Sequence, residues 1–161
     1  MNADVAKGTR EDETRDAIQQ TFKLDQSHAM SGKQPKRKPR PGVDEYGRIP
    51  LHYAAVNGDF DALIRLLDSG SLVNAQDDNG WTALHLAVQD GRSKIVQELL
   101  KRGANPNVAN SHGNGPLWVG LMNARGDLTI IKMLLTAGAD PDYKNIHGRS
   151  PRDIATSGEI A

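Results

Sequence analysis

The sequence predicts an all-α solenoid, in which pairs of helices repeat along the chain and stack on one another. The first observation is a period: Gly47, Gly80 and Gly113 lie 33 residues apart, and a fourth copy begins around Gly148. The second is that two apolar blocks follow each glycine at similar offsets, each long enough for a short helix. A single pair of short helices cannot bury both its faces, so neighbouring pairs must pack together, and about three repeats are needed for stability.

The composition indicates one folded domain without cysteine chemistry. The chain has 161 residues, with 20 Lys and Arg against 20 Asp and Glu, and no Cys. This length suits one domain plus a tail. The lack of cysteine excludes disulfides and thiolate metal sites, and the balanced charge argues against nucleic-acid binding by the whole chain. No apolar run of about 18 residues and no secretory signal is found, so we expect no membrane association and a cytoplasmic location, or a nuclear one in a eukaryote.

Residues 1–43 are expected to be a disordered basic tail. They carry 9 basic and 6 acidic side chains, whereas residues 44–161 carry 11 and 14. Their large apolar residues are too few to offset the entropy lost on ordering the segment. A short helix is expected over residues 14–25, where Ile18 and Phe22 form an apolar stripe. Such a helix is marginal alone, so it needs the folded body or a partner to dock on.

A basic run ends this tail. Residues 33–40, KQPKRKPR, carry five positive charges and no negative one, and their prolines favour an extended chain. This pattern is compatible with a nuclear-import signal, a nucleic-acid contact or a clamp for an acidic partner. The alternative is a solvated linker, because short basic runs are common.

Each repeat is predicted to contain two helices. The first helix opens where a missing or unpaired N–H costs little and ends near a glycine; the openings are Pro50, Ala83 and Pro116, and the ends are Gly58, Gly91 and Gly126. The second helix carries an apolar face, formed by Leu63, Ile64, Leu66 and Leu67, then Ile95, Val96, Leu99 and Leu100, then Ile130, Ile131, Met133, Leu134 and Leu135. We expect Leu66, Leu99 and Leu134 to share one interior.

Two repeats carry a specific motif, which reads IPLHYA from Ile49 and TALHLA from Thr82. It resembles the TPLHxA signature of the ankyrin-repeat family. The resemblance covers residues 44–161, with repeats at 44–76, 77–109 and 110–144 and a partial capping repeat at 145–161. It implies an ankyrin-repeat solenoid whose hairpin loops and first helices form a concave, protein-binding face. In its compactness and its closing HGRSPRDIA, the chain is most similar to small stand-alone bacterial ankyrin proteins, some of which are toxin immunity proteins.

The third and fourth copies depart from the pattern. Trp118 replaces the histidine of the motif, and two extra residues around Ala124 and Arg125 lengthen the connection between the helices. Insertions in solenoids fall in loops, often on a binding face, although drift in a tolerant loop explains this one as well. The last copy is too short for a second helix, so we expect it to cap the stack, with Arg152 and Asp153 making the end surface polar.

The histidines are expected to be structural or solvent-exposed. The resemblance implies that His52 and His85 hydrogen-bond within and between repeats. His112 and His147 are expected to be exposed on successive hairpins, too far apart to share a metal ion. We therefore predict no metal site.

The acidic pairs are expected to be solvated turn residues rather than catalytic groups. They are Asp77 with Asp78, and Asp140 with Asp142, and the predicted solenoid offers no closed pocket around them. The chain also lacks a phosphate-binding loop and a GxSxG nucleophile motif. We therefore predict no catalytic residues and no cofactor.

The family's variable positions mark the predicted partner-binding residues. They fall at hairpin tips and at the ends of the first helices, and are Tyr46, Arg48, Val56, Asn57, Asp78, Asn79, Trp81, Gln89, Asp90, His112, Asn114, Trp118, Met122, Asn123, His147 and Arg149, with Glu45, Ser111 and Ile146 beside them. Aromatic and arginine side chains dominate interface energies, so Tyr46, Arg48, Trp81 and Arg149 are the expected anchors. Trp118 is added because its position is abnormal. Core packing is the alternative for Trp118, and contact with the neighbouring hairpin for Trp81.

The predicted function is non-enzymatic binding of a protein partner on the concave face. The narrower hypothesis is an inhibitor, or immunity protein, of a cognate bacterial toxin. The alternative is a nuclear or cytoplasmic regulatory adaptor that uses the basic tail for import or nucleic-acid contact. The acidic repeat domain favours a partner with a basic patch, and the free chain is expected to be a monomer.

Overall fold

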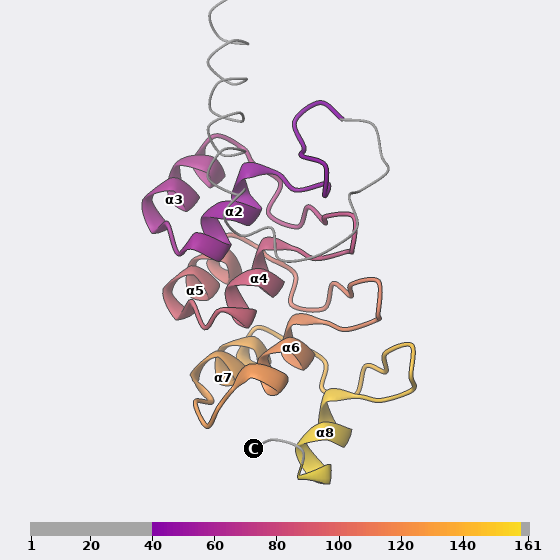
Figure 1. The fold of residues 1–161 in the computed structure, drawn as a ribbon. Helices are drawn as coiled ribbons and strands as arrows, with labels where there is room; N and C mark the ends of the chain where they lie inside the picture. Colours follow the sequence, from indigo (N-terminus) through magenta and orange to yellow (C-terminus); the bar gives the residue numbers. More distant parts are fainter. Residues whose placement is uncertain (1–39, 159–161) are drawn as a thin grey trace, which may run out of the picture.

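A computed structural model describes residues 40–158, which form a stack of helix pairs (Figure 1). The pairs are α2 (Pro50–Asn57) with α3 (Phe60–Asp68), α4 (Ala83–Gln89) with α5 (Ser93–Lys101), and α6 (Pro116–Asn123) with α7 (Thr129–Thr136). The last helix of the described range is α8 (Pro151–Ser157), which lies below α6. The expected all-helical solenoid is confirmed. The helix expected at residues 14–25, and the basic run up to residue 39, lie outside the described residues.

The helix starts follow local sequence signals. Pro50, Pro116 and Pro151 occupy first turns, where the missing N–H has no intrahelical acceptor to lose. Thr82 caps α4, because its Oγ1 accepts a hydrogen bond from the backbone N–H of His85 at 3.3 Å. The first helices of the three full repeats therefore open where the sequence predicts.

The connection in the third repeat is longer than in the first two, as predicted. Helix α6 ends at Asn123, three residues before Gly126, and the loop at residues 124–128 absorbs the two extra residues. Within it, Arg125 has a φ of 43° and Gly126 a φ of 88°. Two successive positive φ values turn the chain away from a helical path, so the helix cannot extend to the glycine.

The inner and outer helices share one apolar core. The leucines at the same position of the inner helices are at most 3% exposed, and are Leu51, Leu84 and Leu117. From the outer helices, Leu99 and Leu134 are fully buried in the same cluster, and Leu66 packs against it while partly exposed. The expected shared interior of these three leucines is confirmed.

Leu135 does not belong to that core, contrary to its predicted place on the apolar face. It is 45% exposed. Its counterpart Leu100 on α5 lines a groove together with residues of α7. No outer helix of the described range follows α7, so the same side of α7 faces solvent at Leu135.

The hairpins between helix pairs share one turn geometry. Each begins with an Asp or Asn whose Oδ1 accepts hydrogen bonds from the N–H groups two and four residues later; these residues are Asp44, Asp77, Asn110 and Asn145. Backbone hydrogen bonds join consecutive hairpins, from Asp78 N–H to Tyr46 C=O at 2.8 Å, from Ser111 to Asn79 at 2.9 Å, and from Ile146 to His112 at 3.2 Å. This ladder fixes the spacing of the hairpin tips.

The last helix presents a polar surface at the end of the described stack. Arg152 and Asp153 are both exposed, as expected for a capping repeat. The Arg152 side chain donates to both carboxylate oxygens of Asp142, at 2.6 and 3.1 Å. Ile154 is 1% exposed, and α8 contacts α6. Two buried residues, Pro151 and Ile154, therefore attach this helix to the stack while its charged residues remain in water.

Candidate protein interface

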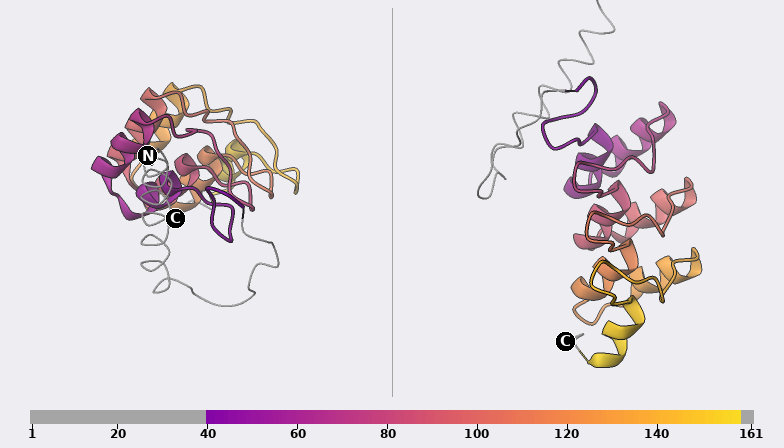
Figure 2. Two further views of the ribbon diagram at one scale, coloured as in Figure 1. Left: turned by 90° about the horizontal axis from the view of Figure 1, so that it is seen from above. Right: turned by 90° about the vertical axis from the view of Figure 1, so that its right-hand side faces the viewer.

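The hairpins and the inner helices form one continuous side of the molecule. Seen from above, the outer helices α3, α5 and α7 lie on one side, the hairpins lie on the other, and the inner helices lie between them (Figure 2). We call the surface made by the hairpin turns (residues 44–49, 77–82, 110–115 and 145–150) and the C-terminal turns of α2, α4 and α6 the concave face. All the predicted partner-binding residues lie on these elements or, for Trp118, at the start of α6.

None of the predicted partner-binding residues is buried. The exposed ones are Asn57, Asn79, Gln89, Asp90, His112, Met122, Asn123 and His147. The half-buried ones are Tyr46, Arg48, Val56, Asp78, Trp81, Asn114, Trp118 and Arg149. Because the ladder holds the tips in register, these side chains form rows across successive repeats.

Arg48 is held inside a network at the first hairpin. Its Nε donates to Asp77 Oδ2 at 3.3 Å, and its guanidinium carbon lies 5.9 Å from the ring centre of Tyr46 and 5.8 Å from that of Tyr53. Tyr53 in turn donates its hydroxyl proton to Asp44. Burial lowers the pKa of Arg48, but Tyr53 and Asp77 outweigh it, and the net pKa is raised. Arg48 therefore links the first hairpin and α2 to the second hairpin, in addition to being a predicted partner-binding residue.

Asp77 corrects the prediction of a solvated turn acid. Its side chain is 1% exposed. Its Oδ1 accepts from the N–H groups of Asn79 and Trp81 at 2.9 Å each, and its Oδ2 accepts from Arg48. The turn pattern did indicate a hairpin start at this position. It gave no sign that Arg48 of the preceding repeat would cover the carboxylate.

Trp81 takes part in both the hairpin and the core. It is half-buried and packs against the core cluster, and its ring centre lies 5.5 Å from that of His85. Trp81 is thus a partly accessible aromatic side chain held in place at the second hairpin. Rigid aromatic side chains of this type lose little conformational entropy on binding.

The motif histidines are structural, as predicted. His52 Nε2 bonds to the Trp81 carbonyl at 3.1 Å and His85 Nε2 to the Asn114 carbonyl at 3.0 Å, so each links one repeat to the next. The Nδ1 of His85 accepts from the backbone N–H of Thr82 at 3.2 Å. The imidazole is therefore neutral, with its proton on Nε2. Burial lowers the pKa of His85 to about 4 and also lowers that of His52.

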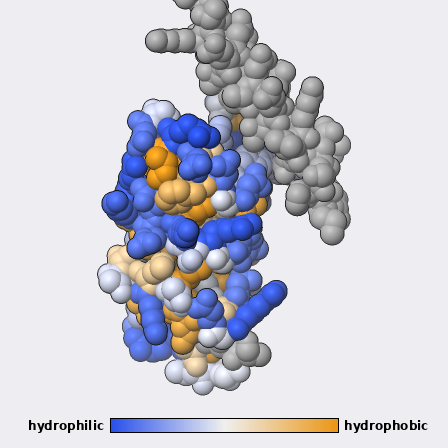
Figure 3. Space-filling view, turned by 90° about the vertical axis from the view of Figure 1, so that its left-hand side faces the viewer, coloured by the Kyte–Doolittle hydropathy of each residue, from blue (hydrophilic) through white to orange (hydrophobic). Residues whose placement is uncertain are grey.

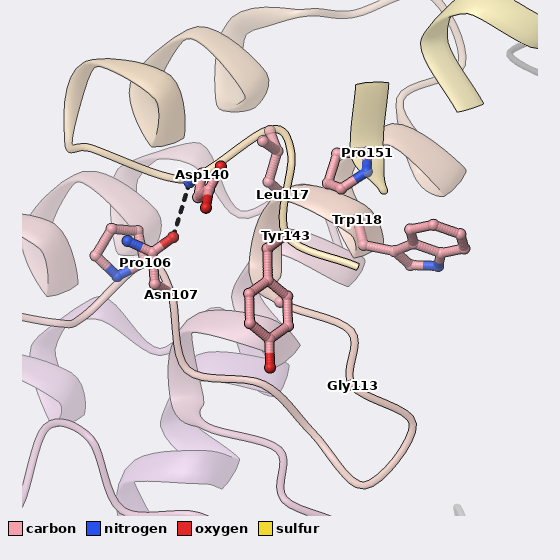
Figure 4. A pocket seen from close by; sticks show the side chains of 9 residues that line it. Pro106, Asn107, Gly113, Leu117, Trp118, Asp140, Tyr143 and Pro151 are labelled. Atoms are coloured by element: carbon pink, nitrogen blue, oxygen red, sulfur yellow. Dashed lines mark hydrogen bonds between the residues drawn. The ribbon is translucent and has the colours of Figure 1, made fainter. Parts of the chain in front are cut away.

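Trp118 stands where the first two repeats have these histidines. It lines a narrow crevice with Leu117 and Tyr143, next to the first residue of α8, Pro151 (Figure 4). Figure 4 shows the Trp118 and Tyr143 rings pointing in different directions. The last hairpin is linked to the third by the Ile146 backbone bond and by Asn145 Nδ2, which donates to Asn114 Oδ1 at 2.9 Å.

The concave face changes character from one end to the other. The first two hairpin tips carry acidic residues at the same turn position, Glu45 and Asp78. Towards the other end, two large apolar side chains are exposed among polar ones: Met122 is 58% and Ile146 65% exposed. Acidic tips and exposed apolar side chains therefore occur at different ends of one face.

The outer face offers a different surface. Figure 3 shows apolar residues there scattered among hydrophilic ones. A groove of about 520 Å³, open to solvent, runs between α5 and α7. Leu100, Met133 and Lys132 line it. The predicted partner-binding residues all lie elsewhere.

Within residues 40–158, no group of three or more His, Cys, Asp or Glu side chains is arranged to hold a metal ion. His112 and His147 are exposed on successive hairpins, as expected. In the same range, no helix has the length and apolar character needed to cross a membrane.

Residues that sequence reasoning missed include Tyr53 and Arg40. Tyr53 occupies the variable position of the motif IPLHYA, and its ring helps to hold Arg48. Arg40 ends the basic run and pairs with Asp78 on the second hairpin. The opposite charges were visible in the sequence, but a contact between residues 38 apart follows only from the fold.

Comparison with known proteins found relatives in eukaryotes. The chain is 41% identical over 66 residues to an ankyrin repeat-containing protein of Schizosaccharomyces pombe, covering 41% of this chain and 32% of the relative. It is 34% identical over 70 residues to protein phosphatase 1 regulatory subunit 27 of Mus musculus, covering 44% and 46%. It is 44% identical over 64 residues to the 2-5A-dependent ribonuclease of Homo sapiens, covering 39% and 9%. The chain thus spans less than half the length of each of these relatives.

These relatives correct the narrower expectation of a bacterial toxin-immunity protein, because they come from yeast, mouse and human and none is named as an immunity protein. The broader expectation holds. A family model described as ankyrin repeats in three copies matches residues 27–110 and 51–145, well over half of the sequence. Together with the stacked helix pairs and the hairpin ladder, this match establishes that the chain belongs to the ankyrin-repeat family.

Proposed function

We propose that this chain is a non-enzymatic protein-interaction module that binds a protein partner on its concave face. The observation that carries the proposal is the row of exposed and half-buried side chains that the hairpin ladder holds in register. The proposed contacts are the partner-binding residues predicted from the sequence. A preorganised surface of this kind binds with a small entropic cost.

The aromatic and apolar side chains of the concave face also favour it as the binding surface. Trp81 and Trp118 are half-buried, and Met122 is largely exposed. Side chains of this kind, fixed in position and partly accessible, supply most of the free energy in protein interfaces. The outer face has a groove with apolar lining, but none of the family's variable positions lies there.

A regulatory adaptor is the second candidate. One relative is named as a regulatory subunit of a protein phosphatase, and the relatives compared above are eukaryotic. The basic run at residues 33–40 would then act in nuclear import or nucleic-acid contact. Deleting these residues and following the location of the chain in cells tests the import role. Binding through the run to nucleic acid predicts an affinity that falls steeply with salt.

Affinity capture with the full chain tests the main proposal. Tyr46→Ala combined with Trp81→Ala is expected to lower retention of the bound protein at least about tenfold, because two anchors are removed. Met122→Ala is a second concave-face variant that leaves the core intact, since this side chain is 58% exposed.

The matched control for capture is on the outer face, where Lys101→Ala and Gln97→Ala alter exposed residues of α5. Circular dichroism must first show that each variant is folded. The proposal would be contradicted if the outer-face variants lost retention while both concave-face variants kept it, because the partner would then bind the outer face.

A further inference from the structure

The basic run ends in a specific contact with the second hairpin. Arg40 Nη2 donates to Asp78 Oδ1, forming an ion pair whose side chains are 50% and 20% exposed. The backbone N–H of the same Asp78 donates to the Tyr46 carbonyl at 2.8 Å. The Asp78 residue is therefore fixed at the hairpin tip by its backbone hydrogen bond, and its carboxylate is neutralised by Arg40.

A tight turn brings Arg40 to this position. The backbone N–H of Val43 donates to the Arg40 carbonyl at 3.3 Å, and Gly42 has a φ of 78°. Proline followed by glycine at the two central positions suits a type II turn. The Pro41-Gly42 pair therefore turns the chain so that Arg40 lies beside Asp78 of the second hairpin.

The first hairpin leaves room for the guanidinium. Gly47 has a φ of 76°, and a Cβ built on it would fall 2.7 Å from Arg40 Nη2 and closer still to Asp78 Oδ1. The equivalent glycines, Gly80 and Gly113, instead approach the backbone of the next hairpin at 2.9 Å. Of these three glycines, Gly47 is therefore the one that lies against a carboxylate. We call Gly47 together with the Asp78 carboxylate the Asp78 site.

We propose that the Asp78 site is an arginine-binding site on the concave face, which Arg40 fills in the free chain and an arginine of the protein partner fills in the complex. This proposal rests on the proposed function, because Asp78 is one of the predicted partner-binding residues. It names the chemistry of the ligand: a guanidinium carried by an extended, basic segment of a protein. The exposed Glu45 at the neighbouring tip adds charge of the same sign.

The physical argument is competition at one carboxylate. A charge-assisted hydrogen bond between a guanidinium and a carboxylate is stronger than a neutral one, but an exposed ion pair is screened and readily exchanged. Arg40 is tethered close by, so its effective concentration is in the range of millimolar. An arginine of the partner must compete with Arg40 for the Asp78 carboxylate. Further contacts between the partner and the concave face supply the binding free energy for this competition.

Nuclear magnetic resonance on the ¹⁵N-labelled full chain tests the proposal without a partner protein. The probe is a synthetic peptide with the sequence of residues 33–42, and the backbone amides of Gly47 and Asp78 are the reporters. In the Arg40→Gln chain these amides are expected to shift and saturate at a lower peptide concentration than in the unaltered chain, where Arg40 competes. The same peptide with Gln in place of its Arg40 is expected to give no saturable shift at these amides.

Two further variants locate the effect. Arg40→Gln combined with Asp78→Asn is expected to abolish the shifts at Gly47. Arg40→Gln combined with Asp61→Asn removes the same charge from an exposed residue of the outer helix α3 and is expected to leave them unchanged. If Asp78→Asn impairs folding, the proposal is still tested by comparing the arginine and glutamine peptides on the Arg40→Gln chain.

Equal titrations in the unaltered and Arg40→Gln chains, or shifts that do not depend on the peptide's final arginine, would overturn the proposal. So would the absence of any saturable shift at Gly47 and Asp78. None of these results would touch the proposed function, because capture of a partner through Trp81 and Met122 does not require an arginine at Asp78.

Discussion

Single residues in this chain join one repeat to the next through hydrogen bonds that depend on charge state. His85 is fully buried, accepts from Thr82 at Nδ1 and donates from Nε2 to Asn114. Protonating Nδ1 would set a donor against the Thr82 N–H. The stacking of the second and third repeats therefore depends on a neutral imidazole, as does that of the first and second at His52.

A pH dependence of stability follows at this residue. The pKa of His85 is lowered from 6.5 to about 4, because burial disfavours the charged ring. Above pH 6.5 the ring is neutral in both states and its contribution is complete. As the pH falls towards 4, the unfolded chain binds the proton first, so the free energy of unfolding should decrease by about 3 kcal/mol in total from this group.

Denaturant unfolding between pH 7 and pH 4 measures this loss. His85→Gln keeps a hydrogen-bonding side chain but removes the titration, so its curve of unfolding free energy against pH should be flatter by that amount. A variant curve parallel to that of the unaltered chain would show that His85 is not the group responsible.

The elements of the fold are held in register by the hairpin ladder, and glycine permits the close approach. Gly113 has a φ of 73°, and a Cβ there would lie 2.9 Å from the Ile146 nitrogen. Gly148 has the same turn position and a φ of 71°, but a Cβ there would meet nothing within 4 Å in the described structure. Substitution of Gly148 would therefore introduce backbone strain alone, whereas substitution of Gly113 would introduce the same strain and a clash with the next hairpin.

Alanine substitution at the two glycines tests the ladder. Both Gly113→Ala and Gly148→Ala impose a left-handed conformation on alanine, at a cost of about 1 to 2 kcal/mol. Gly113→Ala should cost at least about 1 kcal/mol more, because the methyl group forces the last two hairpins apart. Urea unfolding provides the comparison, and equal losses would mean that the hairpins are not in contact there.

Local patterns in the sequence predicted the helices well, because their signals lie within a few residues. Pro50 and Thr82 mark helix starts, and the leucine spacing marks the core. Asp77 and Leu135 were predicted wrongly, because their burial depends on other repeats: Arg48 covers Asp77, and no outer helix of the described range covers Leu135. The predicted partner-binding residues stay a prediction, since accessibility shows only that a partner can reach them.

At the scale of the whole molecule, stacking gives the chain two surfaces of different kinds. The outer helices carry scattered apolar residues, while the concave face runs from acidic tips at Glu45 and Asp78 to exposed Met122 and Ile146. The exposed side chains along the concave face therefore differ in charge and hydropathy from one end of the stack to the other.

Site-specific photo-crosslinking in cells tests the concave face most directly. The full chain carries a benzoylphenylalanine either at position 79, in place of the exposed Asn79 at a hairpin tip, or at position 101, in place of the exposed Lys101 on the outer helix α5. Covalent adducts with another protein are expected from position 79 and not from position 101. Adducts from position 101 with none from position 79 would contradict the assignment of the binding surface.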